Sequence, residues 1–196
     1  VRQLIGKNIS NTEHQYFLID TPEKIQELIS TLSTQKEICF DTETTSVDAN
    51  NCELVGISFS IEPTIAYYIP ISENQTEAQK IIDLFKPILE NENITKIGQN
   101  IKYDCLVLKW YNVEVKGVFF DTMLAHYLME PDNKHGMDYL SETYLKYTPV
   151  SITELIGKKG AKQGTMRDVE IEKVKEYAAE DADVTLQLHH LFKNEI

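Results

Sequence analysis

The stretch Ile38-Cys39-Phe40-Asp41-Thr42-Glu43-Thr44 places two acids directly after a short apolar run. The apolar run predicts a buried strand, and residues two apart on a strand point to the same side of the pleat. Asp41 and Glu43 are therefore expected to lie side by side. Two carboxylates held this close repel one another, and a hard divalent cation such as Mg²⁺ or Mn²⁺ relieves that repulsion. Taken alone, the pair also fits a solvated strand end that leads into a turn.

A second acid follows a later strand pattern, in the run Asn100-Ile101-Lys102-Tyr103-Asp104. Asn100 is predicted to cap a helix, since Asn side chains accept hydrogen bonds from the first free backbone N–H groups of helices. Asp104 lies one helical turn further on and can face the strand end that carries Asp41. By itself, this run is typical of an ordinary helix start.

A third group lies on the last long helical pattern, where Tyr177 and Asp181 are four residues apart and share one face. Ala178 and Ala179 allow that helix to approach its neighbours closely. The neighbouring acids Glu180 and Asp183 point elsewhere and are interpreted as solvated. An amphipathic helix with a surface acid would produce the same local pattern.

The order of the apolar patterns indicates the fold class. Strands come first, then helices alternating with strands, then helices alone, which is typical of an α/β domain with a mixed sheet covered by helices. The predicted strands are 16–19, 38–40, 54–59, 65–69 and 95–98, and the predicted helices are 21–32, 76–90, 100–111, 121–128, 137–147 and 169–192. Asp121 is interpreted as a helix cap, not as a metal ligand.

Composition limits the class of protein. With 196 residues the chain fits one domain, residues 1–14 being a lead-in segment, and an initiator Met is absent at Val1, which favours a piece of a larger chain. Three cysteines without a C-x-x-C spacing favour reduced thiols in the cytoplasm. No apolar run reaches the roughly 18 residues that a membrane span needs. The net charge of −12 excludes a protein whose main task is to grip nucleic acid electrostatically.

Taken together, the three acid groups have a specific order along the chain: D-x-E on a strand, N-x-x-Y-D on a middle helix and Y-x-x-x-D on a late helix. This order resembles the DEDDy subgroup of the DnaQ-like exonucleases. The strings FDTETTS, ELVGISFSIEP, KIGQNIKYD, FDTMLAHYL and YAAEDADVTLQLH are similar to the proofreading 3′→5′ exonuclease domain of bacterial family A DNA polymerases. The resemblance extends from about residue 16 to the C-terminus and implies a ribonuclease H-like, three-layer fold.

The resemblance also implies the chemistry. Asp41, Glu43 and Asp181 would bind one divalent ion, and Asp41 and Asp104 a second, both ions being Mg²⁺ or Mn²⁺. Tyr177 would orient the attacking water in support of Glu43, because a phenol with a pKa near 10 is a poor base at neutral pH. The expected reaction removes 5′-mononucleotides from a DNA 3′ end.

Further residues would contact the single-stranded 3′ end by their places in the family motifs: Thr42, Val47, Gln99, Asn100 and Tyr103. Val47 stands where the family often has a bulkier Leu. The implied partners are single-stranded DNA and the polymerase domain of the same parent chain, in a cytoplasmic monomer. The loop 157–167 is Gly-rich and basic, and either steers the strand or is simply flexible.

Other functions remain as alternatives. A free-standing, ribonuclease D-like exoribonuclease would use the same motifs, and a catalytically idle exonuclease fold could serve as a structural module of a polymerase. The five histidines show no zinc-ligand spacing, and no G-x-S-x-G or paired Cys/His context favours a Ser or Cys hydrolase.

Overall fold

The computed structural model describes residues 6–160 and 162–196, so the first five residues of the expected lead-in lie outside the described part. Six strands of the described chain form one sheet in the order β1-β4-β3-β2-β5-β6. The pairs β2–β3 and β3–β4 are antiparallel, whereas β1–β4, β2–β5 and β5–β6 are parallel. The strands are β1 (Gln15–Leu18), β2 (Glu37–Thr44), β3 (Leu54–Glu62), β4 (Ile65–Pro70), β5 (Thr95–Gly98) and β6 (Phe119–Asp121). The mixed sheet predicted from the sequence is confirmed.

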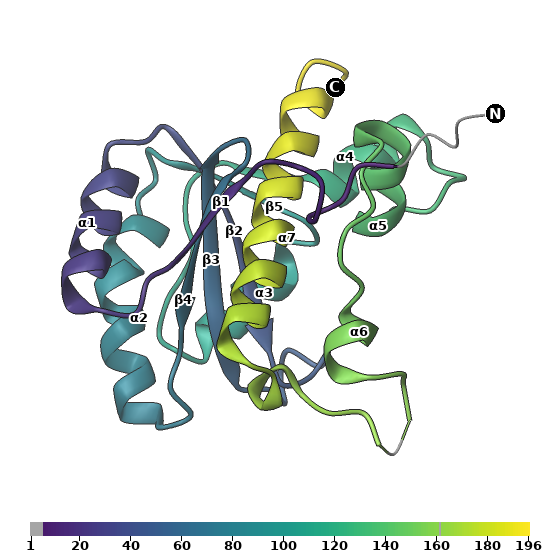
Figure 1. Cartoon of the computed structure of the whole chain (residues 1–196). Helices are drawn as coiled ribbons and strands as arrows, with labels where there is room; N and C mark the ends of the chain where they lie inside the picture. Colours follow the sequence, from purple (N-terminus) through teal and green to yellow (C-terminus); the bar gives the residue numbers. More distant parts are fainter. Residues whose placement is uncertain (1–5, 161) are drawn as a thin grey trace.

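Helices cover both faces of this sheet, which gives the expected three layers (Figure 1). The long helix α7 crosses one face and contacts β1 to β5, while α1 and α2 pack together on the other. The helices are α1 (Pro22–Ser33), α2 (Gln75–Leu89), α3 (Lys102–Lys109), α4 (Thr122–Met129), α5 (Met137–Leu140), α6 (Ile152–Ile156) and α7 (Ile171–Phe192). A π-helical turn, Ser141–Leu145, continues α5, and a short 3₁₀ turn spans Met166–Asp168.

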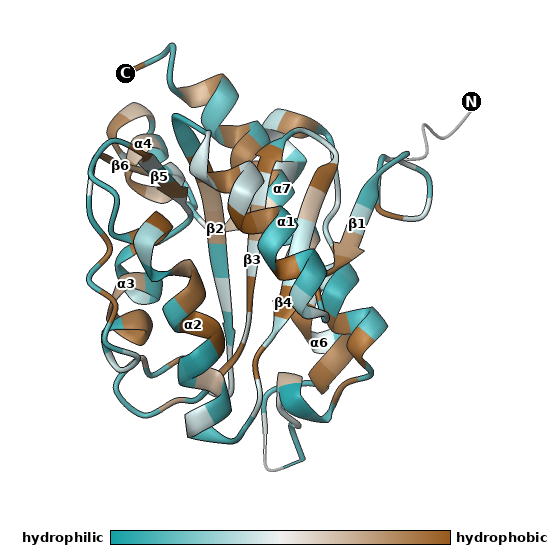
Figure 2. Cartoon of the chain, turned by 90° about the vertical axis from the view of Figure 1, so that its left-hand side faces the viewer, coloured by the Kyte–Doolittle hydropathy of each residue, from teal (hydrophilic) through white to brown (hydrophobic). Residues whose placement is uncertain are grey.

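The alternation of side chains along β2 sorts them between the two layers. Phe40 belongs to the main core, which α1 and α2 cover, whereas Cys39 packs with Leu186 of α7. Asp41 and Glu43 continue the side of Cys39, because side chains alternate along a strand. Figure 2 shows β2 changing from brown to teal along its length, where its apolar half gives way to its acidic half.

Gly56, which pairs with Glu43, leaves room beside that acid for the ring of Tyr68. Gly56 of β3 pairs with Glu43, and a Cβ on Gly56 would lie only 2.2 Å from the ring of Tyr68 on β4. Only glycine therefore lets this aromatic ring lie flat against the middle of the sheet, close to the acids. Tyr68 is buried and donates to the carbonyl of Val55 at 3.3 Å.

Two local predictions were wrong, and one strand was missed. The predicted helix 137–147 ends at residue 145, because Lys146 takes a left-handed conformation with φ 56°. Asn100 does not cap α3: it has φ 57°, and the helix begins at Lys102 without a side-chain cap. The short strand β6 had no sequence signal beyond two phenylalanines. In the described residues, no helix combines the length and apolarity that crossing a membrane requires.

Candidate active site

Three carboxylates converge between the sheet and α7. Asp41 and Glu43 come from the second half of β2, and Asp181 comes from the middle of α7. One oxygen of each carboxylate lies within 4.8 Å of the others. Alanines 178, 179 and 182 of α7 are fully buried, which brings the helix backbone close to the sheet. The approach that the sequence predicted from its alanines is what brings Asp181 to β2.

Asp104 reaches the same strand from α3. Its Oδ1 accepts a hydrogen bond from the backbone N–H of Thr42 at 3.0 Å and another from the Thr42 hydroxyl at 2.5 Å. Thr42 lies between the two acids of β2, so Asp104 is held next to them although it is not one of the three converging groups. Asp104 is buried in the first turn of α3.

Electrostatic repulsion and burial dominate this cluster. Burial, followed by the charges of Asp104 and Asp181, raises the pKa of Asp41 well above its ordinary value. The pKa values of Glu43 and Asp181 are raised in the same way, by burial and then by a neighbouring carboxylate. Burial raises the pKa of Asp104 to about 7, and its hydrogen bonds from Thr42 oppose the rise. Without a cation, the cluster retains protons at pH values where exposed acids are ionised.

The donor set fits a hard divalent cation. It consists of carboxylate oxygens, which Mg²⁺ and Mn²⁺ prefer, and the three converging side chains are close enough for one ion to contact all of them. A bound cation would remove the repulsion that raises the pKa values of these groups. The cluster itself contains only negative charges, and a metal ion would supply the positive charge that it lacks.

Tyr177 lies one turn before Asp181 on α7. Burial, followed by the charges of Asp181 and Glu43, raises the pKa of its phenol. The hydroxyl is therefore protonated at neutral pH and serves as a hydrogen-bond donor, not as a base.

A family model described as 3'-5' exonuclease matches residues 16–196. The chain belongs to the 3′-5′ exonuclease family of polymerase I-type DNA polymerases. The resemblance noted in the sequence motifs is confirmed.

Curated relatives of this exonuclease domain are much longer proteins. DNA polymerase I of Pseudomonas aeruginosa is 40% identical over 161 residues, which cover 78% of this chain and 18% of the relative. DNA polymerase I of Borreliella burgdorferi is 34% identical over 193 residues, which cover 96% of this chain and 21% of that protein. The chain thus spans about a fifth of the length of these relatives.

Solved structures share the fold of the exonuclease domain. Trypanosoma brucei RNase D aligns with a TM-score of 0.74 at 17% identity, covering 91% of this chain and 64% of that chain. Brucella melitensis NrnC aligns with a TM-score of 0.67 at 22% identity, covering 92% and 80% of the two chains. At these identities the likeness establishes the ribonuclease H-like fold alone.

The residues expected to contact nucleic acid separate into two groups in the exonuclease domain. Val47 is 96% exposed on the loop after β2, and Tyr103 of α3 binds that loop through its hydroxyl. Tyr103 donates to the carbonyl of Ser46 at 2.5 Å and lies 2.6 Å from the hydroxyl of Thr44. Through Tyr103, α3 thus holds in place the loop that carries Val47.

The other group is engaged within the protein. The carboxamide of Gln99 donates to the carbonyl of His135 at 2.8 Å and accepts from the hydroxyl of Thr122. Thr42 serves Asp104, and the backbone N–H of Asn100 donates to Asp121 at 3.0 Å. The side chains of Gln99 and Thr42 are thus bound within the protein, whereas Asn100 is bound there through its backbone N–H.

Asp121 caps α4, as predicted, by accepting from the N–H groups of Met123 and Leu124. It also accepts from the N–H groups of Asn100 and Ile101, both at 3.0 Å. The turn before α3, where the sequence predicted a cap at Asn100, is therefore held by a carboxylate from β6, although α3 itself has no side-chain cap. A carboxylate can accept several backbone hydrogen bonds at once, which an Asn side chain cannot match.

The interpretation of Glu180 and Asp183 as solvated was wrong. Both are buried: Glu180 accepts from the hydroxyl of Tyr147 at 2.5 Å and from the N–H of Val150 at 2.8 Å. Asp183 accepts from the hydroxyl of Tyr16 at 2.7 Å and from the N–H of Thr64 at 2.8 Å. The local sequence offered no signal for this burial, because the stretch from residue 178 to 186 mixes three acids with its alanines, valine and leucine.

Arg167 of the basic loop 157–167 is bound within the protein and is not free to contact nucleic acid. Arg167 donates to the carbonyls of Ile71 and Leu54 at 3.1 and 2.8 Å, and lies 3.7 Å from the carboxylate of Glu53. Lys158, Lys159 and Lys162 are exposed. Any steering of nucleic acid by this loop would thus rest on its lysines.

Proposed function

We propose that this chain is a two-metal-ion proofreading exonuclease that hydrolyses the terminal phosphodiester of single-stranded or frayed DNA 3′ ends. The convergence of Asp41, Glu43 and Asp181 within 4.8 Å, in a chain of the 3′-5′ exonuclease family, carries the proposal. Water adds to the phosphorus, the bond to the 3′ oxygen breaks, and a 5′-mononucleotide leaves with a new 3′ hydroxyl on the shortened strand.

The proposal assigns two kinds of task to these residues, metal binding and orientation of the attacking water. Asp41, Glu43 and Asp181 would hold one Mg²⁺ or Mn²⁺ ion, and Asp41 and Asp104 would hold the other. When bound, such ions lower the pKa of water and stabilise negative charge on the leaving oxygen. Tyr177 and Glu43 would orient the water: the phenol, kept protonated by its raised pKa, would donate a hydrogen bond, and the carboxylate would accept one.

The contacts with the single-stranded DNA would lie at the edge of the site. Val47 projects from the loop after β2 and would contact the terminal base, while Tyr103 keeps that loop in place. Thr42, Gln99, Asn100 and Tyr103 would contact the single-stranded 3′ end. With a net charge of −12, the domain would bind the strand weakly and depend on a neighbouring polymerase domain for grip.

We further propose that residues 1–196 form a single exonuclease domain of a longer, cytoplasmic, monomeric polymerase chain. The curated relatives support this, because the matched region is 18–21% of each. The polymerase domain of the same chain would then be its partner.

The test is a 5′-labelled single-stranded oligonucleotide incubated with the protein and Mg²⁺ or Mn²⁺. We expect a ladder that shortens by one nucleotide per step from the 3′ end, 5′-mononucleotide as product, and no reaction with EDTA. An identical substrate with an RNA tail separates a ribonuclease D-like enzyme, which would degrade the RNA faster. A chain that binds Mn²⁺ but cleaves neither substrate, or that binds no Mn²⁺, would contradict the proposal and favour an idle structural module.

A further inference from the structure

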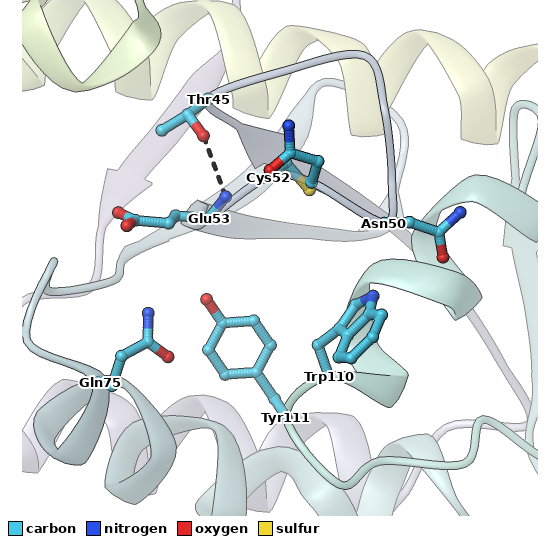
Figure 3. A pocket seen from close by; sticks show the side chains of 8 residues that line it. Thr45, Asn50, Cys52, Glu53, Gln75, Trp110 and Tyr111 are labelled. Atoms are coloured by element: carbon cyan, nitrogen blue, oxygen red, sulfur yellow. Dashed lines mark hydrogen bonds between the residues drawn. The ribbon is translucent and has the colours of Figure 1, made fainter.

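A cavity of about 570 Å³ lies under the loop between β2 and β3, which begins directly after the strand that carries Asp41 and Glu43. The loop forms one wall, with Asn50, Asn51 and Glu53, and the other wall is formed by Gln75 of α2 and by Trp110 and Tyr111 after α3. Figure 3 shows the two aromatic rings and Gln75 facing the loop residues across the open space. The volume is in the range of small-ligand sites, roughly 300–1,000 Å³.

Trp110 gives this cavity an aromatic surface. Its side chain is 63% exposed, and its indole Nε1 donates to the carbonyl of Ala49 at 3.1 Å, which fixes the orientation of the ring. An exposed indole held in one orientation is a ready platform for stacking a nucleobase. It is also the sole tryptophan of the sequence.

The polar groups of the cavity suit a base better than a phosphate. The carboxamides of Asn50, Asn51 and Gln75 each offer a donor and an acceptor, as the edges of nucleobases do. The charged side chain among the described residues that line the cavity is Glu53, and a carboxylate repels phosphate. Arg167, 3.7 Å from the Glu53 carboxylate, does not line the cavity and donates to two backbone carbonyls.

The cavity is joined to the site of cleavage by α3. Tyr103 and Trp110 are seven residues apart, two turns on one side of the helix, or about 10 Å. Both bind the same loop: Tyr103 at the carbonyl of Ser46 at 2.5 Å and Trp110 at the carbonyl of Ala49 at 3.1 Å. A strand whose terminal nucleotide lies near Val47 and Tyr103 thus meets Trp110 further along the same loop.

We propose that this cavity is a nucleobase subsite, which takes an unpaired base of the single strand upstream of the terminal nucleotide and stacks it on Trp110. The inference rests on the proposed exonuclease function. The subsite supplies grip without positive charge, which suits a domain with a net charge of −12. The subsite is distinct from the catalytic carboxylates. Among the described residues that line the cavity, there is none of Asp41, Glu43, Asp104 and Asp181.

Tryptophan fluorescence tests the subsite directly, because the signal comes from Trp110 alone. The Asp41→Ala variant is titrated with the octanucleotide dT8 and, separately, with the mononucleotide dTMP. We expect saturable quenching by dT8 and none by dTMP at the same concentrations. Unchanged fluorescence while anisotropy of a 5′-labelled dT8 reports binding would overturn the proposal. Quenching by dTMP at the concentrations at which dT8 acts would also overturn it, because the site would then take free nucleotide.

Substitutions give an independent measurement by anisotropy. Trp110→Ala should weaken dT8 binding about 5- to 100-fold, the usual loss for one stacked base, and Trp110→Phe should restore most of it. Leu191→Ala is the matched control, since Leu191 is 43% exposed near the end of α7 and does not line the cavity. Affinity of Trp110→Ala equal to that of the unaltered protein, with an unchanged circular dichroism spectrum, would refute the subsite.

Failure of the subsite and failure of the proposed function are distinguishable. Metal-dependent shortening of dT8 by the unaltered protein is measured in parallel. If that activity is absent, the proposed function fails. If it is present and Trp110→Ala binds normally, the subsite alone fails.

Discussion

Asp181 and Asp183 lie two positions apart on α7, and both are buried acids, 7% and 3% exposed. Their surroundings differ. Asp183 accepts hydrogen bonds from Tyr16 and Thr64, and Gln187 donates to it at 2.9 Å. Asp181 faces the carboxylates of Asp41 and Glu43 instead, with oxygens of the three groups within 4.8 Å of one another.

The same contrast holds between Glu180 and the acids of β2. Glu180 has a hydroxyl and a backbone N–H as directed donors, which tie the segment around residues 147–150 to α7. Among the residues that the structure describes, no hydrogen-bond donor reaches the carboxylates of Asp41 or Glu43. Burial alone therefore does not separate functional from structural acids in this protein. The distinguishing feature is the convergence of Asp41, Glu43 and Asp181 on one another, with no donor of the described residues reaching the first two, which leaves a cation as the missing partner.

The largest effect is expected for Asp41→Ala. Removing a carboxylate shared by both proposed ions should lower exonuclease activity by at least about 1,000-fold, because metal ions contribute several kcal/mol to such reactions. The rise of Tm that Mg²⁺ or Mn²⁺ produces by mass action should disappear, whereas the metal-free Tm should be unchanged or higher. Activity assays and thermal melts with and without Mn²⁺ check this. A variant that keeps both activity and the metal response shows that the site is wrongly placed.

Tyr177→Phe should have a smaller effect. Loss of the donated hydrogen bond should lower kcat by about 10- to 100-fold, while KM and the Mn²⁺-induced rise of Tm stay nearly unchanged. Asp181→Ala is the comparison, because it removes a proposed ligand and should be far worse. Equal losses in the two variants would mean that Tyr177 acts through packing or metal binding.

Asp183 represents the hydrogen-bonded, structural acids. Asp183→Ala should therefore lower the stability of the protein but leave its exonuclease activity unchanged. It leaves the hydroxyl of Tyr16 and the N–H of Thr64 without their buried acceptor, at a cost of about 2–3 kcal/mol in the free energy of unfolding. The folded fraction should retain its metal-induced rise of Tm and its activity. Urea unfolding monitored by circular dichroism measures the loss. A stable variant that has lost its metal response would place Asp183 with the functional acids.

The mildest effect is expected from pH. The pKa of Asp104 is about 7 in the folded protein and 3.8 in its ordinary state, so between these values the native state holds a proton that the unfolded chain releases. This contribution to stability is complete below about pH 4 and is lost as the pH rises through 7. The Tm of the metal-free protein should fall by several degrees between pH 5 and pH 8.

Two controls sharpen this pH measurement. Saturating Mg²⁺ should flatten the decline, since the cation favours the ionised carboxylates. Asp104→Asn should also reduce the slope, because its side chain no longer titrates. An undiminished slope in Asp104→Asn would assign the pH dependence to other groups.

The sequence by itself determined much of this protein. The alternation of apolar and acidic residues on 38–44 predicted both the strand and the shared side of Asp41 and Glu43, because side-chain direction on a strand follows position alone. The i, i+4 spacing did the same for Tyr177 and Asp181, and the cap at Asp121 was predicted from its place before a helical pattern. Each of these inferences depends on residues within a turn or a pleat of one another.

Tertiary structure decided which acids are enclosed and what they contact. Glu180 is separated by 33 residues from Tyr147, and Asp183 by 167 residues from Tyr16, so no local pattern could show that these acids are buried and bound. Likewise, Asp121 accepts from the N–H groups of Asn100 and Ile101, just before α3, only because β6 pairs with β5 and brings its carboxylate to that turn. A buried polar group needs a partner, and the chain supplies that partner from wherever folding brings a donor within reach.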